Sequence, residues 1–177
     1  KWVGGASENE NNWNERTNWN IRKVPGDDKN VIIPACQNPP ILTGNPNKLL
    51  SLSVEEGASI NFAGKDVTAT TITNQGEIDF AGSTVNADSI TNNGTVKLTG
   101  KEVLQIQDIK NGEESTVIYY GTNENAKFVW GGNYEKLVIE DGYDVFEDFY
   151  AECTNDEKQY YDITITLAKD ADVAKCL

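Results

Sequence analysis

Apolar and polar residues alternate over short stretches in the middle of the chain, and this pattern repeats every 18 residues. Ile60 and Phe62 alternate with Ser59 and Asn61, which is the pattern of a strand with one apolar face. Five columns of equivalent residues match over three units: Val54, Ile72 and Ile90; Ile60, Ile78 and Val96; Phe62, Phe80 and Leu98; Gly64, Gly82 and Gly100; Val67, Val85 and Val103. A looser fourth unit covers 109–121. Such regularity indicates stacked structural units.

A single unit of this kind cannot bury its own apolar face, so the units must stack on one another. The sequence therefore predicts an all-β fold, a right-handed parallel β-helix with coils of about 18 residues. A left-handed hexapeptide solenoid has coils of the same length, but it needs an aliphatic residue at every sixth position. Asp66, Thr84 and Glu102 occupy every third such position, which favours the right-handed form.

Glycine and asparagine mark the predicted corners of the coils. The glycine column at 64, 82 and 100 suits a corner with positive φ, because glycine has no Cβ. A second corner is marked by asparagines: Asn74, Asn92, Asn93 and Asn111.

The chain is predicted to form one domain, 1–177, capped at both ends. Residues 1–50 form an N-terminal capping coil, 51–121 the repeat coils, and 122–177 the C-terminal coils and cap. Three tryptophans are expected to plug the N-terminal end of the core: Trp2, Trp13 and Trp19. At the other end, a strand with one apolar face is expected to close the core; its apolar residues are Tyr161, Ile163, Ile165 and Leu167.

The charge of the chain narrows the range of partners. A net charge of -13 and a pI near 4.3 disfavour nucleic acid and anionic membrane surfaces. No apolar run reaches the length that spans a bilayer, so no membrane insertion is expected. The chain begins at Lys1 and has no Met, so we expect a processed protein or an excised fragment.

The three cysteines do not form a metal or redox motif, because no CxxC pair and no His is present. We predict a disulfide between Cys153 and Cys176, which flank a strand-like segment. Cys36 then remains as a small buried apolar residue or pairs outside the chain, and pairings that include Cys36 stay open.

The residues that bear reactive or ligating groups give weak signals for catalysis and for metal binding. Without His, no catalytic triad with its usual base can form, and no cofactor is expected. Asp79 beside Lys97 is predicted to form an exposed ion pair between coils. Calcium is a weaker possibility, and the residues that offer oxygen ligands are Asp27 and Asp28, or Glu140, Asp141 and Asp144.

The best candidates for ligand binding lie near the fourth unit. There the outward position occupied by Asn61, Asp79 and Lys97 becomes Ile118, and Tyr120 replaces smaller residues. Either the C-terminal strands cover this apolar surface or a partner binds it. Trp130 and Tyr134 are the preferred exposed pair for stacking on a sugar. The predicted ligand-binding residues are thus Trp130, Tyr134, Tyr120 and Ile118.

The opening pattern W-x-G-G…W…N-W…V-P-G-x-D…V-I-I-P-A, with N-x-G-x-[IV] in the repeats, resembles repetitive surface proteins of Bacteroidetes and spirochaetes and some autotransporter passengers. The resemblance implies an extracellular or cell-surface location and adhesion. The predicted function is a module that binds a glycan or a host or matrix protein. Two alternatives are a structural spacer of a larger surface protein and a small calcium-dependent polysaccharide lyase.

Overall fold

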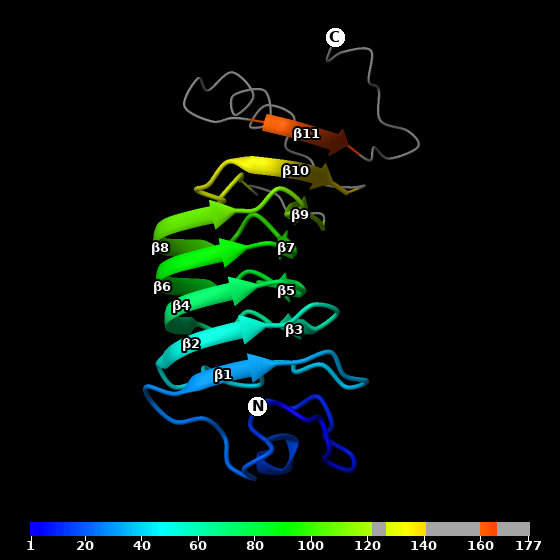
Figure 1. The fold of residues 1–177 in the computed structure, drawn as a ribbon, viewed down its shortest axis with the longest axis vertical. Helices are drawn as coiled ribbons and strands as arrows, with labels where there is room; N and C mark the ends of the chain where they lie inside the picture. Colours follow the sequence, from blue (N-terminus) through cyan, green and yellow to red (C-terminus); the bar gives the residue numbers. More distant parts are fainter. Residues whose placement is uncertain (122–126, 141–159, 166–177) are drawn as a thin grey trace.

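The computed structural model describes residues 1–121, 127–140 and 160–165, and these form a parallel β-solenoid of about six turns (Figure 1). A short 3-10 helix, η1 (Arg16–Asn18), precedes the strands. The strands are β1 (Asn30–Ile33), β2 (Leu49–Val54), β3 (Ser59–Asn61), β4 (Val67–Asn74), β5 (Glu77–Asp79), β6 (Thr84–Asn92), β7 (Thr95–Leu98), β8 (Val103–Asn111), β9 (Thr116–Tyr119), β10 (Tyr134–Ile139) and β11 (Tyr160–Ile165). The predicted all-β solenoid is confirmed.

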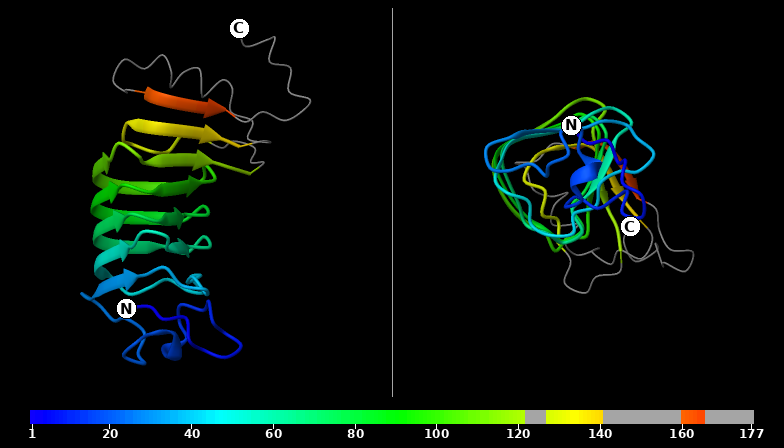
Figure 2. Two further views of the ribbon diagram at one scale, coloured as in Figure 1. Left: turned by 45° about the vertical axis from the view of Figure 1, so that its right-hand side comes forward. Right: turned by 90° about the horizontal axis from the view of Figure 1, so that it is seen from below.

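The strands form two parallel sheets on different sides of the coil. The five-stranded sheet has the order β1-β2-β4-β6-β8, and the six-stranded sheet the order β11-β10-β9-β7-β5-β3. In Figure 1 the near strands run from left to right while the chain rises from the N-terminus, so the coil is right-handed. Figure 2 shows the coils superimposed along the axis of the solenoid.

The register shows that the coils differ in length. Val67 pairs with Val85, 18 residues later, as predicted. Val85, however, pairs with Leu104, 19 residues later. The prediction that Val103 continues this column is therefore wrong: Leu104 takes the inward position, and Val103 is 50% exposed.

The extra residue of this coil is accommodated by Glu102, whose side chain is buried at the corner between β7 and β8. One of its carboxylate oxygens accepts hydrogen bonds from the backbone N–H of Gly82 and from both the N–H and the hydroxyl of Thr99, at 2.8 to 2.9 Å. The other oxygen accepts the N–H of Gly100 at 2.8 Å. The carboxylate thus satisfies the corner's backbone groups.

Equivalent residues stack on one another inside the coil. Phe62 lies on Phe80, with ring centroids 5.2 Å apart. Ile60, Ile78 and Val96 form a second column. Each fully buried side chain of this kind stabilises the fold by about 1.5–3 kcal/mol.

A ladder of asparagines runs through the predicted asparagine corner. The Asn74 amide donates to Asn92 Oδ1 at 2.8 Å, and the Asn92 amide donates to Asn111 Oδ1 at 3.3 Å. Asn74 and Asn92 also accept the N–H of Gly76 and Gly94. A Cβ at Gly76 would collide with a carbonyl oxygen of the preceding coil. The other predicted corner is also confirmed, since Gly64, Gly82 and Gly100 have φ of 71°, 80° and 77°.

The N-terminal end of the core is covered by tryptophans, as predicted. Trp2, Trp13 and Trp19 are at most 1% exposed. Trp19 packs edge-on against both others, at centroid distances of 5.1 and 4.7 Å. The indole N–H of Trp2 donates to Asn38 O, and that of Trp19 to Trp13 O.

At the C-terminal end, β11 pairs in parallel with β10 and extends the six-stranded sheet. It includes three of the four residues predicted for the closing strand. Leu167 lies outside the described residues.

Candidate functional site

The predicted exposed pair, Trp130 and Tyr134, lies in the core with 0% of either residue exposed. The hydroxyls of Tyr134 and Tyr119 lie 3.2 Å apart and share a hydrogen bond. The Tyr119 oxygen also accepts the N–H groups of Val129 and Trp130 at 3.0 Å. The Trp130 ring is 6.5 Å from Phe80, so it continues the aromatic column. The prediction of exposure is wrong because these rings complete the core at this end.

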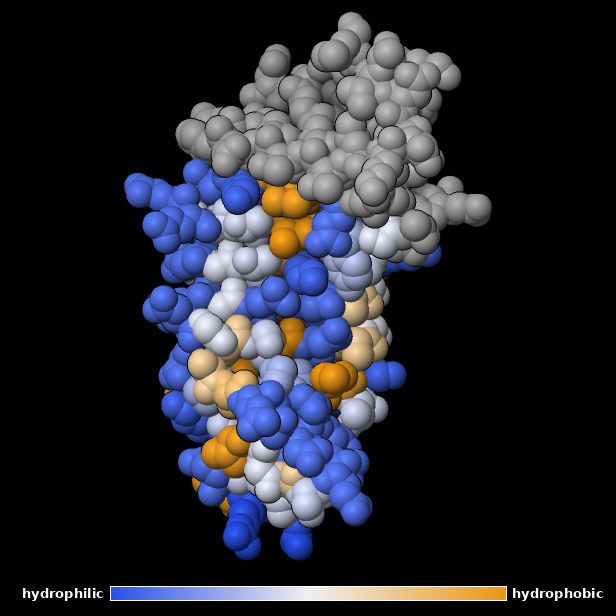
Figure 3. Space-filling model, turned by 90° about the vertical axis from the view of Figure 1, so that its right-hand side faces the viewer, coloured by the Kyte–Doolittle hydropathy of each residue, from blue (hydrophilic) through white to orange (hydrophobic). Residues whose placement is uncertain are grey.

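Tyr120 and Ile118 are half-buried on the outside of the six-stranded sheet. Ile118 is aligned with Lys97 on one side and with Val138 of β10 on the other. Apolar atoms come to the surface beside the grey residues in Figure 3, on an otherwise mostly hydrophilic face. The two explanations of this apolar surface, cover by the chain itself or by a partner, both stay predictions.

Tyr120 belongs to a polar cluster that links coils. Its hydroxyl donates to Asp79 Oδ1 at 2.8 Å, and the Asn61 amide donates to Asp79 Oδ2 at 2.8 Å. The Lys97 ammonium lies over the Tyr120 ring, 5.3 Å from its centroid. Among the described residues the ion pairs are Lys1–Glu55 and Lys110–Asp108, so the predicted Asp79–Lys97 ion pair is not formed.

The electrostatics of this cluster keep its tyrosine neutral. Burial raises the pKa of Asp79, while the Tyr120 hydroxyl and the nearby Lys97 oppose that rise. Burial and the neighbouring Asp79 carboxylate raise the pKa of Tyr120 well above its usual range. The donors and acceptors of the cluster bond to one another, and we assign it a structural role.

The residues predicted as calcium ligands are only partly described. Asp27 Oδ1 accepts the backbone N–H of Lys48 at 3.2 Å, so it supports a turn. Asp141 and Asp144, the predicted partners of Glu140, lie outside the described residues. Within the described part of the chain, no group of three or more Cys, Asp or Glu side chains is placed to bind a metal ion.

Cys36 is a free, half-buried thiol that packs against the core. Its sulfur lies 3.4 Å from Asn38 O, to which it donates. Cys153 and Cys176 lie outside the described residues, so their disulfide stays a prediction.

A regular array of hydroxyl groups, which was not predicted from the sequence, covers the outer side of β2, β4 and β6. We call it the hydroxyl face, and it consists of Ser51, Ser53, Thr71, Thr73, Ser89 and Thr91. The register aligns these residues in two columns of three. The signal was present in the sequence as S-L-S, T-I-T and S-I-T at equivalent places in successive coils.

The geometry of the hydroxyl face follows from the parallel sheet. Neighbouring coils are about 4.8 Å apart, and residues i and i+2 about 6.7 Å. Thr71 is exposed and the other five residues are half-buried. In the described part of the chain, Ser51 is the one member whose hydroxyl has a side-chain partner, Asn30 Oδ1 at 2.8 Å. The columns end at the exposed pair Asp108 and Lys110, whose charged atoms lie 2.9 Å apart.

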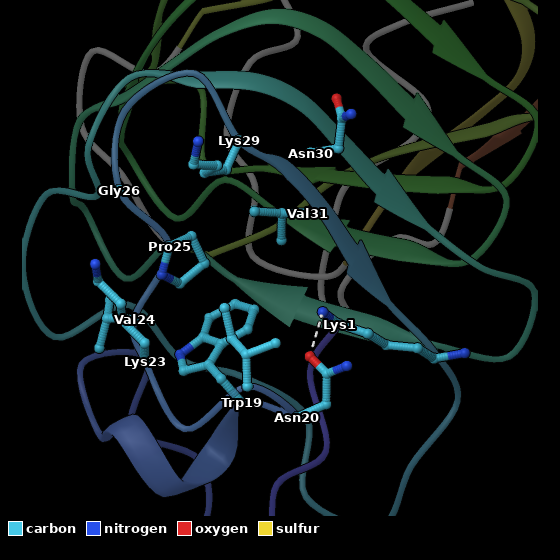
Figure 4. Close-up of a pocket in the computed structure, with 11 residues that line it drawn as sticks. Lys1, Trp19, Asn20, Lys23, Val24, Pro25, Gly26, Lys29, Asn30 and Val31 are labelled. Carbon is cyan, nitrogen blue, oxygen red and sulfur yellow. Dashed lines mark hydrogen bonds between the residues drawn. The ribbon is translucent and has the colours of Figure 1, made fainter.

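A hollow of about 530 Å3 lies beside β1 at the N-terminal end (Figure 4). Trp19, Val24, Pro25 and Val31 give it an apolar lining, as Figure 4 shows. Its other lining residues are Lys1, Asn20, Ile21, Lys23, Gly26, Lys29 and Asn30. We call it the cap hollow.

Fold and surface together define the chain as a right-handed parallel β-helix with a capped N-terminal end. Comparison with protein-family models, curated proteins and solved structures finds no match. The described part of the chain has no helix of the length and apolarity needed to cross a membrane.

Proposed function

We propose that this chain is a non-enzymatic binding module of an extracellular surface protein and that it binds a glycan on the hydroxyl face. The main support is the array of six side-chain hydroxyls on three strands paired in register. Each Ser or Thr hydroxyl both donates and accepts hydrogen bonds, as sugar hydroxyls do. Five of the six have no side-chain partner among the described residues, so they are available to a ligand.

The repeat of the array suits a polymer better than a compact ligand. A glycan chain that runs along the solenoid axis meets an equivalent pair of hydroxyls at each coil. The rise of about 4.8 Å per coil is comparable to the length of one pyranose unit in an extended chain. Several weak contacts in series then add up to useful affinity.

Charge and sequence pattern support the rest of the proposal. The net charge of -13 disfavours polyanions such as nucleic acid. The resemblance of the opening pattern and the repeats to bacterial surface proteins supports an extracellular location.

A structural spacer is the second candidate. It is supported by the asparagine ladder and by the stacked core columns, which connect successive coils and make the solenoid stiff. A spacer needs no ligand, so binding measurements separate the two functions. A lyase stays a sequence-based alternative, and no group of described residues supports it.

The test is a screen of neutral glycans and matrix proteins with the wild-type chain and a Thr73→Val, Thr91→Val variant. Valine keeps the shape of threonine and removes the hydroxyl. We expect at least about tenfold weaker glycan binding in the variant, since each lost hydrogen bond contributes about 1 kcal/mol.

The matched control is Thr68→Val, Thr84→Val, which changes outer threonines of the same strands away from the hydroxyl face. Equal loss in both variants, or binding to a matrix protein alone, would refute a glycan site on this face. Absence of any binding would favour the spacer.

A further inference from the structure

Charge is distributed unevenly along the solenoid. Residues 1–50 contain 6 Lys or Arg and 5 Asp or Glu, a net charge of +1. Residues 51–177 contain 9 Lys or Arg and 23 Asp or Glu, a net charge of -14. The cap region is therefore the part of the chain where an anionic ligand meets the least repulsion.

Within the cap region, positive charge gathers around the cap hollow. Three lysines and no carboxylate are among the residues that line it. Lys1 Nζ is paired with Glu55 at 3.4 Å. Among the described residues, no carboxylate lies within ion-pair distance of Lys23 or Lys29, and both are exposed. These two ammonium groups are available to an anion.

The residues that line the cap hollow indicate what kind of molecule carries the anionic group. Ile21 is 69% exposed and Val24 is half-buried, so these two lining residues offer apolar surface, while Trp19, Pro25 and Val31 line the hollow as buried residues. A bare phosphate has no apolar surface to place there. A pyranose that carries a carboxylate has both a charged group and an apolar C–H face. The volume of about 530 Å3 is in the range of small-ligand sites.

We propose that the cap hollow binds a carboxylate-bearing sugar residue, with Lys23 and Lys29 contacting the carboxylate and the apolar lining contacting the ring. This inference rests on the proposed function in taking the ligand to be a glycan. Asn30 lines the hollow and also bonds to Ser51 at the end of one hydroxyl column. An acidic sugar in the hollow can therefore belong to a chain that continues along the hydroxyl face.

The test measures binding of a trimer of galacturonic acid by calorimetry, with its methyl ester as the neutral match. In Lys23→Gln, Lys29→Gln we expect affinity for the acid trimer to fall about tenfold, since each partly exposed ion pair contributes modestly. The ester should bind both proteins equally. Raising the salt concentration should weaken only the acid trimer.

The control variant is Lys65→Gln, Lys101→Gln, which removes the same charge from corners outside the hollow. Equal weakening in both variants would overturn the proposal, because general charge would then explain the effect. Tighter binding of octanoate or inorganic phosphate than of the acid trimer would overturn the sugar assignment. Loss of ester binding in the Thr73→Val, Thr91→Val variant concerns the hydroxyl face alone, so the two proposals fail separately.

Discussion

Replacing Glu102 with alanine tests whether the longer coil depends on a buried carboxylate. The side chain is 5% exposed and accepts four hydrogen bonds, three of them from backbone N–H groups. A hydrogen bond to a charged group contributes about 1.5–3 kcal/mol net, and a buried N–H left without a partner costs about 1–3 kcal/mol. Water can replace part of the carboxylate at a corner, so we expect Glu102→Ala to lower the free energy of unfolding by about 3–5 kcal/mol.

Urea unfolding followed by circular dichroism measures this difference. Glu102→Gln keeps the shape of the side chain and one acceptor oxygen, so it should lower the free energy of unfolding by only about 1–2 kcal/mol. The control is Ser83→Ala at the equivalent corner one coil earlier, where the buried hydroxyl has no partner among the described residues. Its effect should stay below about 0.5 kcal/mol. If Glu102→Ala cost no more than Ser83→Ala, the carboxylate would not be what stabilises the corner.

Three further predictions follow from the core, a corner and the polar cluster. Trp130→Ala should lower the free energy of unfolding by about 3–5 kcal/mol, because the ring is buried; an unchanged urea midpoint would contradict this. Gly76→Ala should lower the free energy of unfolding by about 2–3 kcal/mol through overpacking, whereas Gly26→Ala, where an added Cβ meets open space, should lower it far less. Thermal unfolding of the two variants measures the difference. Tyr120→Phe removes a donor to Asp79, so NMR titration should show a still higher pKa for this carboxyl. The pKa of Asp79 in the folded protein exceeds the ordinary 3.8, so the contribution of Asp79 to stability should fall as the pH rises from 3.8 through that folded pKa. A contribution that increases over this pH interval would contradict the prediction.

The repeated part of the fold was readable from sequence because strand alternation and corner geometry leave local signals. Ile60 and Phe62 alternate with polar residues, and glycine at 64 takes the positive φ that other residues avoid. Trp2 and Trp19 were recognisable as a plug because a solenoid core needs a cover at its end.

The wrong predictions concern features that depend on residues distant in sequence. The extra residue near Glu102 moves the register by one, and the alternative alignment on Val103 preserved a valine column equally well. Trp130 looks like an exposed aromatic in a glycine-rich segment, yet it packs near Phe80 from a different coil. The hydroxyl face was overlooked because Ser and Thr are ordinary residues on the solvent side of strands.

The tryptophan plug also affects how two molecules can associate through their strand edges. A parallel solenoid ends in strands whose free backbone groups can template aggregation. At the N-terminal end, the backbone N–H of Trp2 donates to Ile32 O at 2.9 Å, and the three indoles cover the apolar interior. A second molecule meets backbone that is already partly bonded and a core that is already covered. Edge-to-edge pairing of strands is therefore disfavoured over this part of the solenoid.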